Sequence, residues 1–395
     1  MVLESGKETT RLASLKDVRT TKHQSAIHWP NVRLNYAIIS SSEHPVRGDR
    51  KMKKLILSAL IIASALFGAA QTKAQPMREV VRRVDASVVV VKTVEKNVLR
   101  APQPIFVSSP GLGSGMFIGD GRILTAAHVV QAADKIEVEF VDGQTVPAKV
   151  IASVPPADVA LLKLDWVPYN AVAAKLGNSD NMQVGDEVFV IGAPYGISHS
   201  LSVGHVSARR ASNVSFGAAV NLELIQTDAA INRGNSGGPV FNMAGEVIGV
   251  VSHIFSQSGG FEGLGFAVAS NVAEKLVVNS KGFWTGIDGL LLRDEWVRIF
   301  NIPQRAGFLV QRIADNSPAS RIGLIGGTQS ANIAGSEFLV GGDVILAVSG
   351  IEVSTDANCT AKMFEYFSKL SAGDTVALKV LRGGQIVELK GTVPN

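Results

Sequence analysis

Cysteine is almost absent from this chain. Cys359 is the single cysteine among 395 residues, so neither a disulfide framework nor a cysteine-rich metal site can form within one chain. The scarcity of cysteine does not exclude an oxidising compartment, because it shows only that the fold needs no disulfide bond. Two readings of Cys359 remain: a small apolar filler, or a redox-active thiol that lacks a resolving partner.

Charged and aromatic residues are also scarce. Charged residues make up 18% of the chain and hydrophobic residues 46%, which excludes a disordered chain and indicates well-buried globular domains. Aromatic residues make up 6%, against 39 glycines, a balance that suits many short strands joined by turns. The length allows two or three domains.

The net positive charge of the chain comes from its N-terminal end. Residues 1–54 hold 11 Lys or Arg and 5 Asp or Glu, a net charge of +6, whereas the whole chain carries +4. Residues 55–395 therefore carry about −2. This distribution argues against nucleic acid as a partner.

Residues 52–74 have the pattern of a secretory signal peptide. Met52-Lys53-Lys54 is a short positive start, and an uninterrupted run of apolar and small residues follows over 55–70. We expect cleavage after Ala70 or Ala74. The run is shorter than the roughly 20 residues that a membrane-spanning helix needs. An uncleaved N-terminal anchor, which would associate with the membrane, remains the alternative.

Residues 1–51 are unusual in front of such a signal. They are polar, contain Pro30 and Pro45, and have no periodic apolar face. A second methionine, Met52, stands where a signal peptide should start. We therefore interpret residues 1–51 as a mis-annotated or disordered extension, with translation beginning at Met52.

Short strand patterns alternate with turn signals over residues 78–275. The apolar and alternating runs predict strands, and few stretches have helical spacing. Many strands at this spacing predict a mainly β fold with a barrel. The runs are residues 86–91, 113–118, 122–130, 135–140, 159–164, 187–192 and 247–252.

A serine lies among glycines in Gly234-Asn235-Ser236-Gly237-Gly238-Pro239. A serine hydroxyl is a poor nucleophile unless a base takes its proton and donors stabilise the oxyanion. The glycines let the backbone turn sharply and direct consecutive N–H groups at one point. Alone, the stretch is equally well a glycine turn that contains a serine.

Two further residues complete a candidate catalytic set. His128 is expected at the end of a hydrophobic strand, where its ring could project into a cleft. Asp158 comes just before an apolar strand, where a carboxylate needs a hydrogen-bond donor such as an imidazole N–H. Each alone is more often structural, but with Ser236 they form a triad hypothesis. The remaining histidines past the leader lack metal-ligand spacing, so we expect no metal site and no cofactor; they are His199, His205 and His253.

Four sequence blocks carry a resemblance to a known family: residues 125–130, 157–163, 191–196 and 226–239. Together they resemble the HtrA-type (high-temperature-requirement) serine proteases of the bacterial envelope, over residues 78 to 393. The resemblance implies a trypsin-like double β-barrel with its active site between the barrels.

The resemblance also implies roles for individual residues. Ser236 is the nucleophile, His128 the general base and then acid, and Asp158 orients the imidazole. Backbone N–H groups of Gly234, Asn235 and Ser236 form the oxyanion hole. Ala230, six residues before the nucleophile, implies a primary pocket for small aliphatic side chains. Arg209 and Arg210 lie near a loop that the family uses for sensing, or are solvated surface charges.

Residues 283–393 read as a second, small β-rich domain. Strand patterns appear at 307–313, 341–348 and 375–380, and residues 358–370 have helical spacing. The blocks Ser317-Pro318-Ala319, Gly342-Asp343-Val344-Ile345 and Gly373-Asp374-Thr375-Val376 resemble a bacterial PDZ domain.

Such domains bind a peptide C-terminus by adding it as a strand and capturing its carboxylate on backbone N–H groups. The resemblance assigns the carboxylate loop to Trp284, Thr285, Gly286 and Ile287. Two departures from the family leave peptide preference and assembly open. Residues 325–337 form an insertion, and only one such module is present where many relatives have two.

The leading hypothesis is an exported serine endopeptidase, in the periplasm or cell envelope, that hydrolyses unfolded or damaged proteins. One alternative is a peptide-binding scaffold whose protease domain is inactive, and another is an anchored protease that cleaves a single partner. Trimers are common in the family, but nothing in the sequence shows one.

Overall fold

The computed structural model describes residues 76–99, 105–215 and 221–393. All the described residues belong to one compact unit. The extension predicted over 1–51 and the leader predicted over 52–74 lie outside the described residues, so both remain predictions. Within the described ranges, no helix combines the length and the apolar character needed to cross a membrane.

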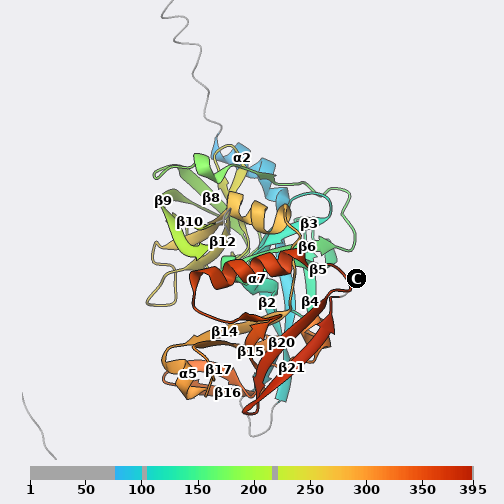
Figure 1. Ribbon diagram of the computed structural model, residues 1–395. Helices are drawn as coiled ribbons and strands as arrows, with labels where there is room; N and C mark the ends of the chain where they lie inside the picture. Colours follow the sequence, from blue (N-terminus) through green and yellow to red (C-terminus); the bar gives the residue numbers. More distant parts are fainter. Residues whose placement is uncertain (1–75, 100–104, 216–220, 394–395) are drawn as a thin grey trace, which may run out of the picture. The chain divides into compact units, whose positions relative to one another are not determined.

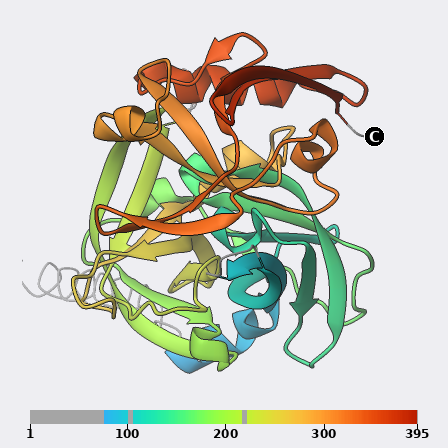
Figure 2. The ribbon, with the colours of Figure 1, turned by 90° about the horizontal axis from the view of Figure 1, so that it is seen from below.

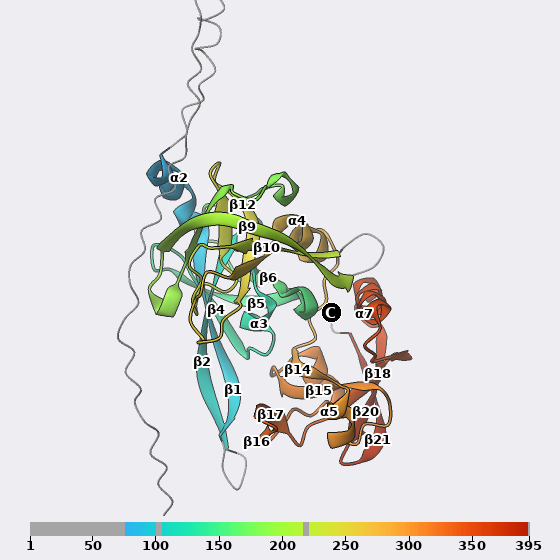
Figure 3. The ribbon, with the colours of Figure 1, turned by 90° about the vertical axis from the view of Figure 1, so that its left-hand side faces the viewer.

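The first barrel accounts for the strand patterns before residue 165. The predicted strand at 86–91 begins at Val88, because Asp85–Ser87 form a turn of 3-10 helix. Figure 3 shows the first two strands continuing past the barrel as a long ribbon. In the described residues the closed barrel has the spatial order β1 (Val88–Leu99), β2 (Ile105–Phe117), β3 (Arg122–Thr125), β6 (Val159–Leu164), β5 (Thr145–Val154), β4 (Lys135–Glu139).

The second barrel follows directly in the chain. A further pairing between its strands β11 and β12 closes the sheet. Figure 2 shows the first barrel in teal and the second in green to yellow. The mainly β, double-barrel prediction is confirmed. The described strands of this sheet have the order β11 (Pro239–Asn242), β8 (Glu187–Gly192), β9 (Ser200–Ser215), β10 (Asn221–Thr227), β13 (Gly265–Ala269), β12 (Glu246–Ile254), β7 (Lys175–Leu176).

Apolar residues on both faces of β1 explain its continuous valine run. Val89 and Val91 belong to the first barrel's core, whereas Val88 packs in a second cluster with Met116 and Leu124. Successive residues of a strand face opposite sides, so a strand buried on both faces shows no polar alternation. The second cluster also holds the interior of the second barrel and buried residues of helix α2 (Met77–Val84).

The C-terminal module is a separate sheet with one long helix. Helix α7 (Ala357–Lys369) matches the helix predicted at 358–370 to within one residue at each end (Figure 1). Met363 and Phe367 pack against the core of the module, but Phe364 packs against the second cluster, which includes residues of both barrels. The described sheet has the order β14 (Ile287–Arg293), β15 (Ala306–Ile313), β18 (Val344–Val348), β20 (Thr375–Arg382), β21 (Gln385–Thr392), with β19 (Ile351–Glu352) paired to β18.

The predicted insertion folds as a hairpin of its own. Strands β16 (Gln329–Ile333) and β17 (Ser336–Val340) form a two-stranded sheet. Phe338 on β17 lies 4.7 Å from the ring of Trp296, which belongs to helix α5 (Glu295–Ile299). The hairpin thus has a small aromatic core and leaves the six-stranded sheet uninterrupted.

Candidate active site

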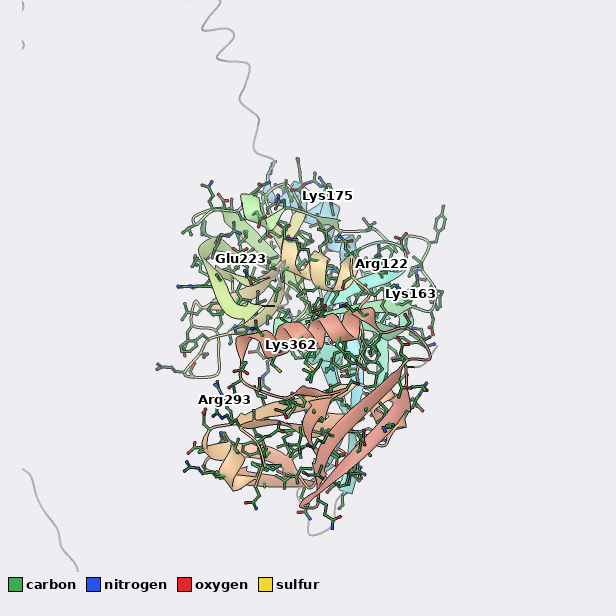
Figure 4. All side chains as sticks on the ribbon, in the orientation of Figure 1. Arg122, Lys163, Lys175, Glu223, Arg293 and Lys362 are labelled. Atoms are coloured by element: carbon green, nitrogen blue, oxygen red, sulfur yellow. The ribbon has the colours of Figure 1, made fainter. Side chains whose placement is uncertain are left out.

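The ladder between β3 and β6 brings His128 and Asp158 to the same edge of the first barrel. Arg122 pairs with Lys163 at one end of this ladder, where both are labelled in Figure 4. Thr125 pairs with Ala160 at the other end. The chain leaves β3 toward His128 and enters β6 from Asp158, so the antiparallel pairing alone brings the two residues together.

The local structure at His128 differs from the expected strand end. Strand β3 ends at Thr125, and His128 lies in the short helix α3 (Ala127–Val130). Val129 and Val130 favour strands by propensity, but both side chains are buried in the first barrel's core. Tertiary packing therefore overrides the propensity, and the strand predicted over 122–130 is too long.

His128 and Asp158 form a close pair. Nδ1 of His128 lies 2.9 Å from both carboxylate oxygens of Asp158, and the backbone N–H of His128 donates to Oδ1 at 3.0 Å. Asp158 has φ 55°, a left-handed conformation that turns the chain sharply before β6. The His128 side chain is 50% exposed, and its Nε2 has no hydrogen-bond partner in the described chain. The ring is held on one side and free on the other.

The pair perturbs the pKa of both members. Burial acts to lower the pKa of His128, but the hydrogen bond to Asp158 and its negative charge outweigh burial and raise it. Burial acts to raise the pKa of Asp158, but the bonds from His128 and Ser252 outweigh burial and lower it. Asp158 is thus held as a carboxylate beside an imidazole that protonates readily.

Ser252 is a further partner that the sequence did not point to. Its hydroxyl donates to Oδ2 of Asp158 and lies 3.0 Å from Nδ1 of His253. The His253 ring stacks on Phe266 at 5.1 Å. A serine at the end of an apolar strand gives no signal for this role, because such a hydroxyl is more often satisfied by nearby backbone.

Ser236 lies on a tight loop between β10 and β11. Gly234 has φ 102°, and a Cβ there would come within 2.1 Å of the carbonyl oxygen of Ala193. The Ser114 hydroxyl donates to the carbonyl of Gly234 at 2.6 Å, and the Ser114 N–H donates to that of Ser236 at 2.8 Å. Only glycine fits at 234, and β2 holds the loop in place.

The loop leaves two backbone donors without partners. The N–H of Asn235 donates to the carbonyl of Asn232 at 3.0 Å. In the part of the chain that the structure describes, the N–H groups of Gly234 and Ser236 donate to no other group. Two free N–H donors, one on the serine and one two residues before it, are an arrangement that can stabilise an oxyanion.

Gly113 lies between the segment that carries His128 and the loop that carries Ser236. A Cβ at Gly113 would lie 2.6 Å from the side chain of Val129, next to His128, and 3.1 Å from the carbonyl oxygen of Ser236. Among the described residues, no hydrogen bond joins the Ser236 hydroxyl to His128. Such bonds are often long in unliganded proteases and tighten when substrate binds.

The predicted peptide loop leads into β14, an edge strand of the C-terminal sheet. Gly286 has φ 75°, which a glycine tolerates at this turn. Between β14 and α7 lies a cavity of about 460 Å³ with a mostly apolar lining. Side chains from both elements line it, together with the loop before Asp158; they include Ile287, Leu291, Phe308, Met363, Phe364, Phe367, Val154, Pro155 and Pro156.

Family comparison agrees with this architecture. The family described as "Trypsin-like peptidase domain" matches residues 113–250, and the "PDZ domain" family matches residues 277–393. The first match contains the three candidate triad residues, and the second contains the predicted peptide loop.

Similar curated proteins come from several bacteria. A "Probable periplasmic serine endoprotease DegP-like" of Pseudomonas fulva (strain 12-X) is 41% identical over 256 residues, 62% of this chain and 52% of the relative. A "Probable periplasmic serine protease do/HhoA-like" of Haemophilus influenzae (strain ATCC 51907 / DSM 11121 / KW20 / Rd) is 36% identical over 289 residues, 71% of this chain and 57% of the relative. The chain spans about half the length of the curated relatives it matches.

Solved structures of related proteases are also similar. The "HtrA-type protease AlgW with tripeptide" is 30% identical, with 80% of this chain and 97% of that chain covered and a TM-score of 0.46. The family matches and the curated relatives agree with the resemblance in the sequence. The chain therefore belongs to the HtrA-type serine proteases and combines a trypsin-like peptidase domain with a C-terminal PDZ domain.

Proposed function

We propose that this chain is a serine endopeptidase that hydrolyses peptide bonds through an acyl-enzyme. The observation that carries the proposal is the paired His128 with a free Nε2, beside a serine loop with two free N–H donors. The hydrogen bonds from His128 and Ser252 outweigh burial and hold Asp158, the group that orients the ring, in its charged form. The similarity to named serine endoproteases supports the same reaction.

In the proposed reaction, Ser236 Oγ attacks the carbonyl carbon of the scissile bond while Nε2 of His128 takes the hydroxyl proton. The carbonyl electron pair moves to oxygen, where the N–H groups of Gly234 and Ser236 stabilise the negative charge. Asn235, the third predicted donor, is engaged with Asn232 in this structure and would contribute only after the loop shifts. The C–N bond then breaks, and His128 gives its proton to the leaving amine. A water molecule, deprotonated by His128, then attacks the acyl-enzyme, the ester bond to Ser236 breaks with return of the proton to its oxygen, and the peptide is released with a new carboxyl group.

We propose a primary pocket that accepts small aliphatic side chains. Ala230 provides no charge that would select lysine or arginine. Ile231, next to Ala230, is buried, and a Cβ at Gly265 would lie 2.6 Å from its side chain. The space between Ile231 and Gly265 is therefore already largely filled. A set of chromogenic peptides with Val, Ala, Phe or Arg before the scissile bond would test this preference.

We further propose that the PDZ domain binds peptide C-termini at Trp284, Thr285, Gly286 and Ile287. Its edge strand and the apolar cavity beside α7 support this mode of binding. We propose unfolded or damaged proteins of the cell envelope as substrates, on the basis of the family resemblance. The names of the relatives support the periplasm as the compartment. The family resemblance is the support for a homotrimer. The leader pattern is the support for an uncleaved membrane anchor.

Unfolded casein is the substrate that tests the proposal. The full chain should cleave it, Ser236→Ala should not, and Ser371→Ala, which changes an exposed serine after α7, should cleave normally. If the unmodified chain and Ser236→Ala are equally inactive, even with C-terminal peptides added, the inactive peptide-binding scaffold is the better account.

A further inference from the structure

We propose that the side chain of Gln131, from the protease domain, occupies the edge of β14 on which a peptide C-terminus would dock. Peptide binding to the PDZ domain must then displace Gln131, which adjoins the helix carrying His128. The inference rests on the proposed peptide-binding function of the PDZ domain and adds a competing occupant for the same site.

The free edge of β14 can be identified from its hydrogen bonds. The carbonyl of Gly286 accepts from the N–H of Ala314 at 2.9 Å, so Gly286 faces β15. Successive residues of a strand direct their N–H and C=O groups to opposite sides. The N–H and C=O of Ile287 therefore face away from β15, toward the edge that a peptide strand would add to. An incoming terminal residue would donate its N–H to the carbonyl of Ile287.

Gln131 already holds this acceptor. Its Nε2 donates to the carbonyl of Ile287 at 2.9 Å and to Oγ1 of Thr285 at 3.1 Å. Its Oε1 accepts from the Ser153 hydroxyl at 2.6 Å, and its backbone carbonyl accepts from Nε1 of Trp284 at 3.1 Å. The side chain is buried, with both ends of the amide satisfied. Three residues of the predicted carboxylate loop thus contact one glutamine of the other domain.

The contact connects to both catalytic partners by short paths. The N–H of Gln131 donates to the carbonyl of Ala127 at 2.9 Å and closes α3, the helix that contains His128. Ser153 lies near the end of β5, and the chain runs from there through Pro155–Ala157 to Asp158. Displacing the amide would release one constraint on α3 and one on the segment before Asp158. Docking and peptide binding would be linked, each weakening the other by the same factor.

Peptide affinity measures this competition directly. The protein is the full chain carrying Ser236→Ala, so that no peptide is cleaved. The probes are fluorescein-labelled decapeptides with free carboxylates, ending in Val, Leu, Phe or Asp, titrated by anisotropy. Gln131→Ala removes the competing donor, and Gln131→Glu keeps the acceptor for Ser153 but places an oxygen against the carbonyl of Ile287. Gln144→Ala, at an exposed hairpin turn, is the matched control.

We expect both Gln131 variants to bind the preferred peptide roughly five- to tenfold more tightly, since two neutral hydrogen bonds no longer compete. Gln144→Ala should bind like the parent. Peptide should also speed hydrogen exchange of the amides at 127–131 in the parent chain, a readout that needs no Gln131 variant. Equal affinity in all four proteins, with exchange at 127–131 unchanged, would overturn the inference but leave peptide binding intact. Failure of every peptide with every protein would instead reject the peptide-binding function, and the inference with it.

Discussion

At the residue scale, the account depends on one carboxylate and the ring that it orients. Asp158 accepts hydrogen bonds from the ring and backbone of His128 and from Ser252, so its position and charge are both fixed. The bond to Nδ1 leaves Nε2 as the base toward Ser236. This arrangement makes two predictions.

Asp158→Asn should preserve the fold but lower turnover by about 10⁴, because an amide at 158 can stabilise the wrong tautomer of His128. Casein hydrolysis by purified variant and parent, compared at equal concentration and with matching circular dichroism, measures the effect. Near-normal turnover in a folded variant would mean that Asp158 does not orient the ring.

The pH profile should show the raised pKa of His128. The base must be neutral to accept a proton, so kcat/KM should fall on the acid side with an apparent pKa above about 6.5. The raised value also means that the pair stabilises the fold below the unfolded pKa, and that this contribution is lost as pH rises through the folded one. In Asp158→Asn, an NMR titration of the His128 ring should give a lower pKa, since the two largest effects that oppose burial are removed. An unchanged ring pKa in that variant would contradict the electrostatic role of Asp158.

The sequence could indicate His128, Asp158 and Ser236 because each stands beside a strand pattern or a glycine turn. Ser252 and Gln131 could not be found this way. Their partners are 94 residues away at Asp158 and 156 residues away at Ile287, and no local pattern marks either contact. Such contacts depend on how distant elements pack.

At the element scale, the serine loop is the most constrained segment of the site. Residue 234 has a left-handed backbone conformation, and Gly234→Ala would place a methyl group against the carbonyl of Ala193. The loop must then move, which displaces one oxyanion donor. We expect kcat to fall by about 10²–10³. Steady-state hydrolysis of a chromogenic peptide measures kcat.

Gly143→Ala is the matched control for backbone strain. Gly143 has φ 82°, and a Cβ there meets nothing within 4 Å. Gly143→Ala should therefore lower the stability of the fold but change kcat little. Comparable loss of kcat in both variants would assign the effect to general strain rather than to the donor at Gly234.

Element boundaries show where sequence patterns stop being informative. The helix at 358–370 and the strand at 159–164 agree with α7 and β6 to within a residue. The sequence patterns do not predict the outer parts of β1 and β2, after residue 91 and before residue 113. These parts are held by pairing with each other and not by a continuous apolar run. The insertion after Leu324 stands out in the sequence as a departure from the family pattern, but its hairpin depends on aromatic contacts to α5.

At the scale of the whole molecule, the chain combines two barrels, a PDZ domain and a predicted leader. The proposed boundaries, 78–275 and 283–393, remain predictions beside the family matches at 113–250 and 277–393. Phe364 on α7 packs against a core cluster of the protease domain that includes residues of both barrels. Contacts of this kind could not be read from either module alone.

The predicted leader makes a prediction for the exported protein. The chain expressed with its natural N-terminal region in a Gram-negative host should reach the periplasm, with a first residue just after Ala70 or Ala74. N-terminal sequencing of the recovered protein gives the answer. Retention of residues 55–70 in the membrane fraction would favour the anchor, and retention of residues 1–51 would contradict a start at Met52.

The central claim is that Ser236 is a nucleophile activated by His128. Its most direct test is the mass of the full chain after reaction with a fluorophosphonate, which forms a stable bond with an activated serine oxygen. The account predicts one adduct, mapped to Ser236, that forms far more slowly in His128→Ala. Equal labelling of Ser236 in His128→Ala, or an adduct on another serine with Ser236 unmodified, would contradict it.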